Sequence, residues 1–152
     1  MPLEVEVVSR VRELYHTENA RMVIIPGSEG EMGVLPHHTP LLTTLAFGEL
    51  RVVEEDGKTS SFVVYGGVVE VRPHKVTVLA DDAESVGELN IERIQAARER
   101  AHELMEESPS DEQRSQIVQE LRRAEIAAKI QARVAGRPFQ SVRTLDDAND
   151  GV

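Results

Sequence analysis

Residues 50–79 read LRVVEEDGKTSSFVVYGGVVEVRPHKVTVL, a segment in which short apolar or β-branched runs follow one another closely. The runs occupy residues 50–53, 62–65, 68–71 and 76–79. Asp56 and Gly57 lie between the first two runs and can supply the positive φ of a tight hairpin turn. Pro73 and His74 separate the last two just as closely. Short strands at this spacing, with no helical pattern between them, predict an antiparallel β-sandwich or barrel rather than a parallel sheet.

The same pattern extends toward the N-terminus. Apolar residues alternate with Glu over residues 3–7, as expected of a strand with one solvated face, and another β-branched run covers residues 22–25. Seven of the ten Gly lie within residues 27–67, where they indicate frequent turns. We therefore predict an all-β domain over residues 1–84, an antiparallel β-sandwich of about ten short strands.

The composition changes after this segment. Residues 88–135 contain no Gly and one Pro, Pro109, which predicts helices on either side of it. Asn90 suits an N-cap, and a stop is expected near Glu107 because Pro109 disfavours helical geometry at the preceding residue. Ser110 and Gln113 have capping-box spacing. We predict a helical hairpin over residues 85–136, ended by Gly136.

The apolar stripes of this hairpin are rich in Ala. The first helix has Ile94, Ala97, Ala101 and Leu104, and the second has Ile117, Leu121, Ala124, Ala128, Ala132 and Ala135. Burying Ala gains little free energy, since stabilisation scales with apolar area, and the stripes hold no aromatic anchor. Two interpretations remain open: a helical pair that can undock and move, or a statically packed hairpin.

Composition excludes several classes of protein. The chain has 152 residues and a formal net charge of −10, with most of the excess acid before residue 85. The acidic balance argues against a nucleic-acid surface, and the absence of Cys excludes disulfide scaffolds, thiolate metal sites and Cys nucleophiles. The start MPLEVEVV is acidic where a signal peptide is basic, and no apolar run is long enough to span a membrane, so we expect a soluble, cytoplasm-facing protein. Residues 137–152 form an acidic segment for which we predict disorder.

No catalytic constellation emerges from the motifs. His37 and His38 are adjacent but lack the spacing of common metal sites, and a turn explains them equally well. The glycines of GSEGEMG, residues 27–33, are not followed by a P-loop Lys, and no Ser has a GxSxG setting. We expect no enzyme. Two alternatives stay open: a stand-alone β-sandwich binding module, and a small metal-dependent sandwich enzyme that uses His37 and His38.

Three segments carry a resemblance to a known family. PGSEGEMGVLPHHTPLLTTL at residues 26–45, YGGVVEV at 65–71 and VTVLAD at 76–81 together resemble the signature of the epsilon subunit of bacterial F-type ATP synthases. The two predicted helices complete the likeness to about residue 136. This resemblance implies a non-catalytic rotor subunit whose sandwich lies at the foot of the central stalk, against the gamma subunit and the c-ring, and helps couple proton flow to rotation and ATP synthesis. Such a protein is peripheral, at the cytoplasmic face of the bacterial plasma membrane.

The resemblance also implies that the helices are a mobile arm. When extended, this arm blocks ATP hydrolysis by meeting an acidic segment of the catalytic beta subunits. The candidate contacts are Arg122, Arg123, Lys129 and Arg133, which could also be a solvated helix face, with His37 and His38 as further partner-contact candidates.

Some members of the family bind regulatory ATP on the folded hairpin through a motif [IL]DxxRA. The stretch that matches this motif is LNIERI at residues 89–94, which keeps the motif's Arg as Arg93. Glu84, Arg93, Arg100 and Arg123 also match positions that ATP-binding members use. Asn90 replaces the motif's acid, Ile94 replaces its small residue, and Ala127 stands where a further Arg is expected. The sequence therefore predicts weak or no ATP binding, and no cofactor or metal.

Overall fold

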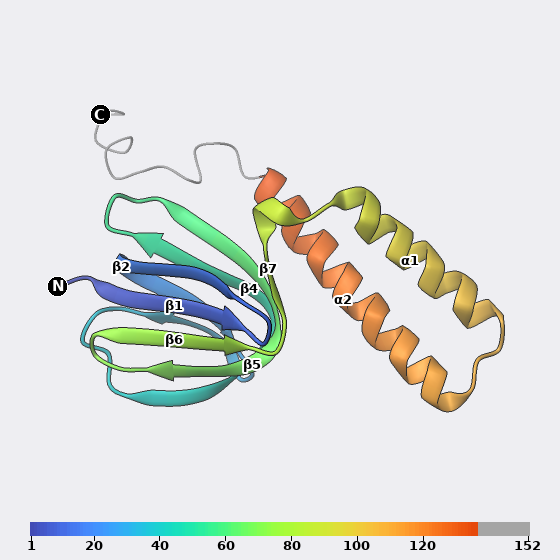
Figure 1. Ribbon diagram of the computed structural model, residues 1–152, viewed down its shortest axis with the longest axis horizontal. Coiled ribbons are helices and arrows are strands. Elements are labelled where there is room, and N and C mark those ends of the chain that lie inside the picture. Colours follow the sequence, from blue (N-terminus) through green and yellow to red (C-terminus); the bar gives the residue numbers. More distant parts are fainter. Residues whose placement is uncertain (137–152) are drawn as a thin grey trace.

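The computed structural model describes residues 1–136; the predicted disordered tail, residues 137–152, lies outside the described residues. Seven strands come first, followed by a short 3-10 turn and two helices (Figure 1). The strands are β1 (Leu3–Ser9), β2 (Glu13–Gly27), β3 (Gly30–Val34), β4 (Leu41–Glu54), β5 (Thr59–Val71), β6 (Lys75–Ala80) and β7 (Ala83–Ser85). The turn η1 spans Val86–Glu88, and the helices are α1 (Ile91–Glu106) and α2 (Asp111–Gly136).

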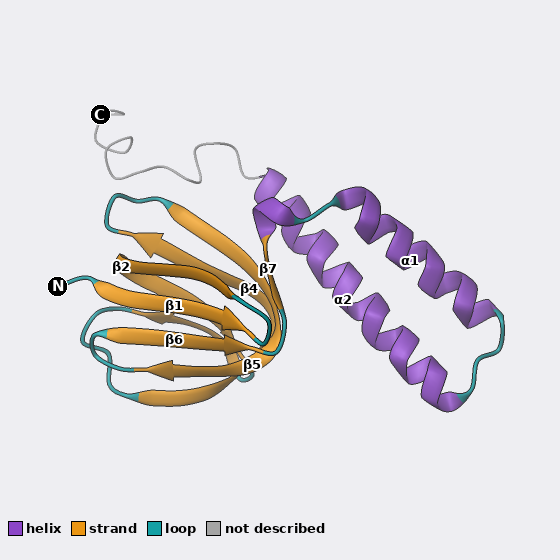
Figure 2. Ribbon diagram, in the orientation of Figure 1, coloured by secondary structure: helices purple, strands orange, loops and turns teal. Residues whose placement is uncertain are grey.

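The strands pair in the order β1-β6-β5-β4-β2-β3, and β1 also pairs with β2, so five of them form a closed ring (Figure 2). β7 pairs with β5 outside this path. The predicted class, a β-sandwich or barrel followed by a helical hairpin, is confirmed. One pairing departs from the prediction, because β1 runs parallel to β6 while the other pairs are antiparallel.

The predicted number of strands is wrong. The structure has seven strands among residues 1–136 instead of about ten, because β2, β4 and β5 each continue for 13 to 15 residues. The runs 62–65 and 68–71, expected as separate strands, both belong to β5. Gly66 and Gly67 join them with positive φ values of 83° and 131°, and a Cβ on Gly67 would lie 2.3 Å from the carbonyl oxygen of Leu79. Glycine thus lets the strand bend without ending.

The core fills the inside of the ring. In β1, Leu3, Val5 and Val7 are fully buried while the residues between them are partly exposed, as the alternation predicts. The expected hairpin at Asp56 and Gly57 is present: Gly57 has a φ of 88°, and the amide of Lys58 donates to Asp56 Oδ1 at 2.8 Å.

The helix ends follow their cap residues. Asn90 Oδ1 accepts from the amide of Arg93 at 3.2 Å, and α1 ends at Glu106, just before Pro109. Ser110 and Gln113 form the predicted capping box, with reciprocal side-chain to backbone bonds of 3.1 and 3.3 Å. Local sequence therefore accounts for both helices and for the turn between them.

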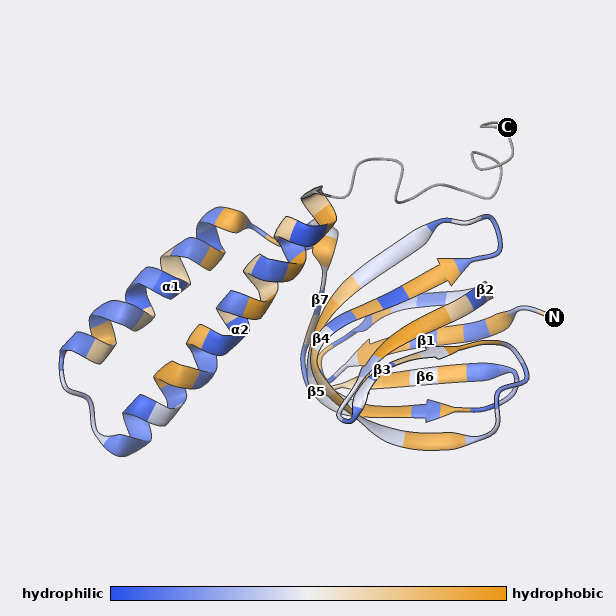
Figure 3. Cartoon of the chain, turned by 180° about the vertical axis from the view of Figure 1, so that it is seen from behind, coloured by the Kyte–Doolittle hydropathy of each residue, from blue (hydrophilic) through white to orange (hydrophobic). Residues whose placement is uncertain are grey.

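α2 lies between α1 and the sandwich, and the tip of the hairpin points away from the strands (Figures 1 and 3). The predicted Ala stripe is wrong in the second half of α2, where Ala132 and Ala135 are exposed. Ala127 and Ile130 are buried instead. The buried positions change along the helix because the second half of α2 packs on the sandwich as well as on α1.

Candidate functional site

The sandwich holds the helical arm, defined here as α1 and α2, through an apolar contact. Ile130 of α2 is buried in a cluster with Val63, Tyr65 and Val86. Partly buried apolar residues surround this cluster: Phe47, Leu89, Ile126 and Val134. Full burial of one Ile side chain contributes roughly 1.5–3 kcal/mol, so Ile130 anchors the arm more strongly than an Ala stripe would.

Two arginines of α2 lie over aromatic rings of the sandwich. The guanidinium of Arg122 is 5.1 Å from the centroid of Phe47, and that of Arg123 is 4.3 Å from the centroid of Tyr65. Arg123 also donates to Asp82 in an ion pair. The two rings meet edge to face with centroids 5.7 Å apart. Aromatic faces and a carboxylate thus hold these two cations together.

A third arginine reaches a buried carboxylate. Arg133 Nη1 lies 3.6 Å from Glu49 Oε1, and Arg51 Nε lies 3.8 Å from the same oxygen. The Glu49 side chain is only 3% exposed. Lys129, the fourth base predicted to meet a partner, is exposed on α2. Three of the four predicted partner contacts therefore face the sandwich.

Tyr65 lies in the contact between the arm and the sheet. Burial raises the pKa of its phenol to about 12, helped by the charge of Glu84 and opposed by that of Arg123. The residue is 7% exposed. Since α2 supplies part of this cover, the ionisation of Tyr65 reports on docking.

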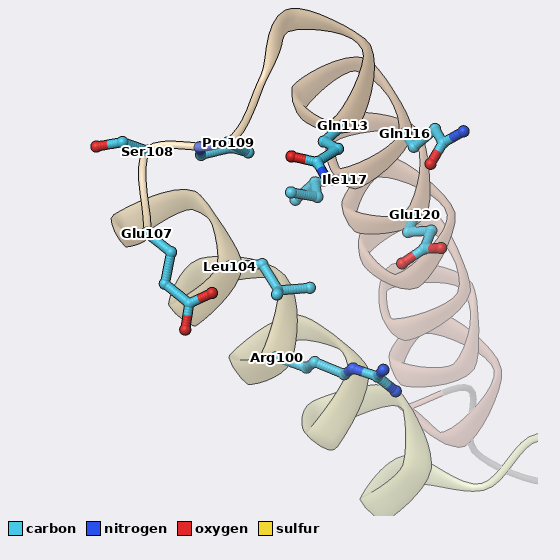
Figure 4. A pocket seen from close by; sticks show the side chains of 9 residues that line it. All are labelled: Arg100, Leu104, Glu107, Ser108, Pro109, Gln113, Gln116, Ile117 and Glu120. Atoms are coloured by element: carbon cyan, nitrogen blue, oxygen red, sulfur yellow. The ribbon is translucent and has the colours of Figure 1, made fainter.

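Four of the five predicted ATP-site residues line one cleft of about 310 Å³ between the sandwich and the two helices. They are Glu84, Asn90, Arg93 and Arg123. Arg100 lies elsewhere, in a separate cleft of about 410 Å³ near the tip of the hairpin, where Leu104 and Ile117 face each other (Figure 4). Whether the first cleft binds ATP stays a prediction.

The charges in the first cleft suit a nucleotide poorly. Two bases, Arg93 and Arg123, share it with three acids, Glu84, Glu88 and Glu120. Arg123 is paired with Asp82, and Glu88 is paired with Arg12 at 2.7 Å. The Asn90 side chain is engaged as the cap of α1, and Ile94 and Ala127 line the walls. A triphosphate would therefore meet more acids than bases in this cleft. Weak or no ATP binding stays a prediction.

His37 and His38 shape a loop at the end of the sandwich. His37 has a φ of 67°, donates its amide to Pro73 O at 2.8 Å, and meets the ring of His74 edge to face. His38 Nδ1 lies 2.6 Å from Thr39 O. These contacts agree with the turn interpretation; their role as partner contacts stays a prediction.

Metal-ligating side chains gather elsewhere on the sandwich. Among residues 1–136 one such group is found, Glu4, His16 and Glu18, whose candidate ligand atoms lie within 4.8 Å of one another. His16 Nε2 is 3.0 Å from Glu4 Oε1, and this hydrogen bond raises the pKa of His16 and lowers that of Glu4. Lys75 also contacts Glu4, at 3.5 Å. The group is an exposed ion-pair network, and the hypothesis of a metal enzyme built on His37 and His38 receives no support from it.

A second surface of the sandwich is apolar and uncovered. Leu42, Val68 and Leu79 are 69, 38 and 52% exposed on β4, β5 and β6. Val68 pairs with Leu79 on one side and with Thr44 on the other, so these side chains lie in adjacent strands. We call Leu42, Val68 and Leu79 the open strip.

Sequence reasoning missed the residues on the sandwich side of both surfaces. The signal for the covered face was present in residues 62–65, a run apolar at every position, which requires cover on both faces of the strand. The signal for the open strip was the pair Val68 and Val69, since two neighbours in a strand point to opposite faces. Nothing local distinguishes Asp82 or Glu49 from other acids.

The fold and these surfaces define a β-sandwich subunit that carries a docked helical arm and an uncovered apolar face. No helix within residues 1–136 is long and apolar enough to cross a membrane. The family model described as "ATP synthase, Delta/Epsilon chain, beta-sandwich domain" matches residues 2–86.

Relatives extend this match beyond the sandwich. The ATP synthase epsilon chain of Alkalilimnicola ehrlichii is 42% identical over 129 residues, covering 85% of this chain and 90% of the relative. That of Bordetella parapertussis is 38% identical over 142 residues, covering 93% and 97%. A chain of the Euglena gracilis mitochondrial ATP synthase, solved with OSCP, F1 and c-ring, superposes with a TM-score of 0.66 at 26% identity, covering 88% of this chain and 81% of that one. The chain belongs to the ATP synthase epsilon chain family, which confirms the resemblance of its sequence.

Proposed function

We propose that this protein is a rotor subunit of a proton-translocating ATP synthase, without an active site of its own. Its sandwich binds the gamma subunit and the c-ring, and its arm restrains ATP hydrolysis. The observation that carries the proposal is that this chain of the epsilon family has two apolar surfaces with different surroundings. The arm covers part of β4 and β5, whereas the open strip on β4, β5 and β6 stays uncovered.

The open strip suits a permanent protein partner. Exposed aliphatic side chains on three neighbouring strands offer an apolar surface that a protein partner can cover. The Euglena chain to which this protein is similar was solved in an assembly with F1 and the c-ring, which supports the gamma subunit and the c-ring as occupants. We propose that the attachment is peripheral and lies at the cytoplasmic face of the plasma membrane.

The arm suits a partner that it meets only part of the time. One small apolar cluster and the contacts of three arginines hold it on the sandwich, and only the contact of Arg133 with Glu49 reaches a buried charged group. In the extended state Arg122, Arg123, Lys129 and Arg133 would face an acidic segment of the catalytic beta subunits and stop hydrolysis. Charge complementarity of this kind sets register and speeds association.

Regulatory ATP is not needed for this mechanism. The acidic balance of the cleft around Arg93 and Arg123 supports weak or no nucleotide binding. Isothermal titration of the full chain with ATP tests this, and a micromolar affinity would overturn it.

Reconstitution tests the proposed function. The full chain and a chain ending at Asn90 are each added to a catalytic complex containing the gamma subunit, and binding and ATP hydrolysis are measured separately. We expect both to bind and only the full chain to inhibit. Equal inhibition by both would refute the role of the arm, and failure of both to bind would favour a stand-alone binding module.

A further inference from the structure

The basic residues proposed to meet an acidic partner already have partners on the sandwich. Arg122 lies over Phe47, and Arg123 pairs with Asp82. Arg133 lies beside Glu49. Among the contacts of residues 1–136, Lys129 is the exception, since it is exposed and no ion pair of it is found. Of these four basic residues, the docked arm therefore leaves Lys129 exposed and holds the other three against its own chain.

The two carboxylates come from parts of the sandwich that are far apart in sequence. Glu49 lies in β4 and Asp82 just before β7, yet both meet the same face of α2. Glu49 is enclosed between Arg51 and Arg133, whereas Asp82 is half-exposed and also accepts from the amide of Ala83 at 2.9 Å. Glu49 is therefore buried, whereas Asp82 stays accessible to water.

We infer that Asp82 and Glu49 are internal competitors of the acidic partner, holding Arg123 and Arg133 so that the arm can bind that partner only after these ion pairs open. The inference rests on the proposed function only in naming the outside partner as an acidic protein segment. The pairing inside the chain stands on the geometry alone.

The exchange of partners conserves ion pairs between the docked and the bound state. Arg123 and Arg133 each leave a carboxylate of the sandwich and each gain a carboxylate of the partner. Lys129, free in the docked state, can make the first contact. The half-exposed pair of Asp82 and Arg123 contributes little to the stability of the chain, so a substitution of Asp82 shifts the balance without unfolding it.

The test measures docking in the full chain without any other subunit. Because the chain has no Cys, Lys58→Cys and Glu103→Cys introduce two unique label sites, one on the sandwich and one on α1, for distance-dependent energy transfer. Asp82→Asn keeps the side-chain volume and the oxygen that caps Ala83, so the fold is retained. The matched control is Glu70→Gln, whose ion pair with Arg72 lies within the sandwich.

We expect Asp82→Asn to raise the ratio of released to docked arm about two- to fivefold, and Glu49→Gln to raise it as well, while Glu70→Gln leaves it unchanged. Poly-L-glutamate, used as the acidic probe, should bind Asp82→Asn and Glu49→Gln more tightly than the parent, and adding Arg123→Gln should abolish the gain for Asp82→Asn. Unchanged energy transfer in both acid variants, with circular dichroism showing a folded sandwich, would overturn the inference. The expected increase in release, if it comes without stronger inhibition of ATP hydrolysis, would instead count against the proposed function and leave the internal pairing intact.

Discussion

The two halves of β5 have similar residues and different surroundings. Over residues 62–65 every side chain is buried, because Val63 and Tyr65 lie under α2 while Phe62 and Val64 face the core. Over residues 68–71 burial alternates, and Val68 stays exposed. A strand that is apolar at consecutive positions therefore has an outer face that is covered either by another element of the same chain or by another molecule. In β5 only the first half is covered by the chain itself, through α2.

The largest expected effect comes from the inner face that both halves share. Phe62→Ala should lower the free energy of unfolding of the sandwich by about 3–5 kcal/mol, because it leaves a cavity beside Tyr15, whose ring lies 5.4 Å from that of Phe62. Urea unfolding measures this, with Ser61→Ala as the neighbouring control. A loss under about 1 kcal/mol would mean that the neighbouring side chains fill the space left by the Phe62 ring.

The covered outer face is tested by Ile130→Ala. We expect docking of the arm to weaken by about 2 kcal/mol, while the unfolding of the sandwich changes little, because the arm can detach instead of straining the sheet. Hydrogen exchange of α2 and of β5 separates these two events. Val118→Ala, at a position of α2 that is 49% exposed, is the control. Equal loss of protection in both elements would show that arm and sandwich unfold as one unit.

Alkaline pH should loosen the same contact through Tyr65. Its pKa is raised to about 12 in the docked state, against about 10 for a solvated Tyr, so the neutral phenol favours docking. This contribution is complete below about pH 10 and is lost as the pH rises through the docked pKa. Absorbance of tyrosinate in a Tyr15→Phe background follows Tyr65 alone. Ile130→Ala should lower the observed pKa toward 10, and an unchanged value would show that α2 is not its source.

The open strip should give the smallest effect on stability. Leu79→Ser is expected to change the free energy of unfolding by no more than about 0.5 kcal/mol, because the side chain is half-exposed. Binding to a stalk complex should fall about tenfold if the strip is the interface. Val11→Ser, an apolar position 86% exposed at the β1–β2 turn, should leave both quantities unchanged. Equal losses of binding in the two variants would remove the distinction between the strip and ordinary exposed residues.

Much of this architecture could be predicted from neighbouring residues. The alternation over residues 3–7 predicted β1, Asp56 and Gly57 predicted their hairpin, and Asn90 predicted the start of α1. The predictions that failed concern how far a strand continues and which residues distant in sequence come into contact. β5 was divided at Gly66 because glycines resemble a turn, whereas two positive φ values bend the strand and keep its pairing.

The candidate site shows the same limit. The resemblance to ATP-binding members grouped Arg100 with Glu84, Asn90, Arg93 and Arg123. The fold brings the last four to one cleft, whereas Arg100 lines another. The anchors Ile126, Ile130 and Val134 were overlooked because a second helical face was not expected on α2.

Periodicity, caps and glycine positions act over a few residues, so the order of strands and helices and the family signature are written in the chain. What each surface contacts cannot be predicted from such local patterns. Whether an arginine of α2 is free or paired depends on Asp82 and Glu49, which lie 41 and 84 positions away from Arg123 and Arg133. Such contacts arise only when the closed ring of strands and the angle of α2 bring distant residues together, which no local pattern encodes.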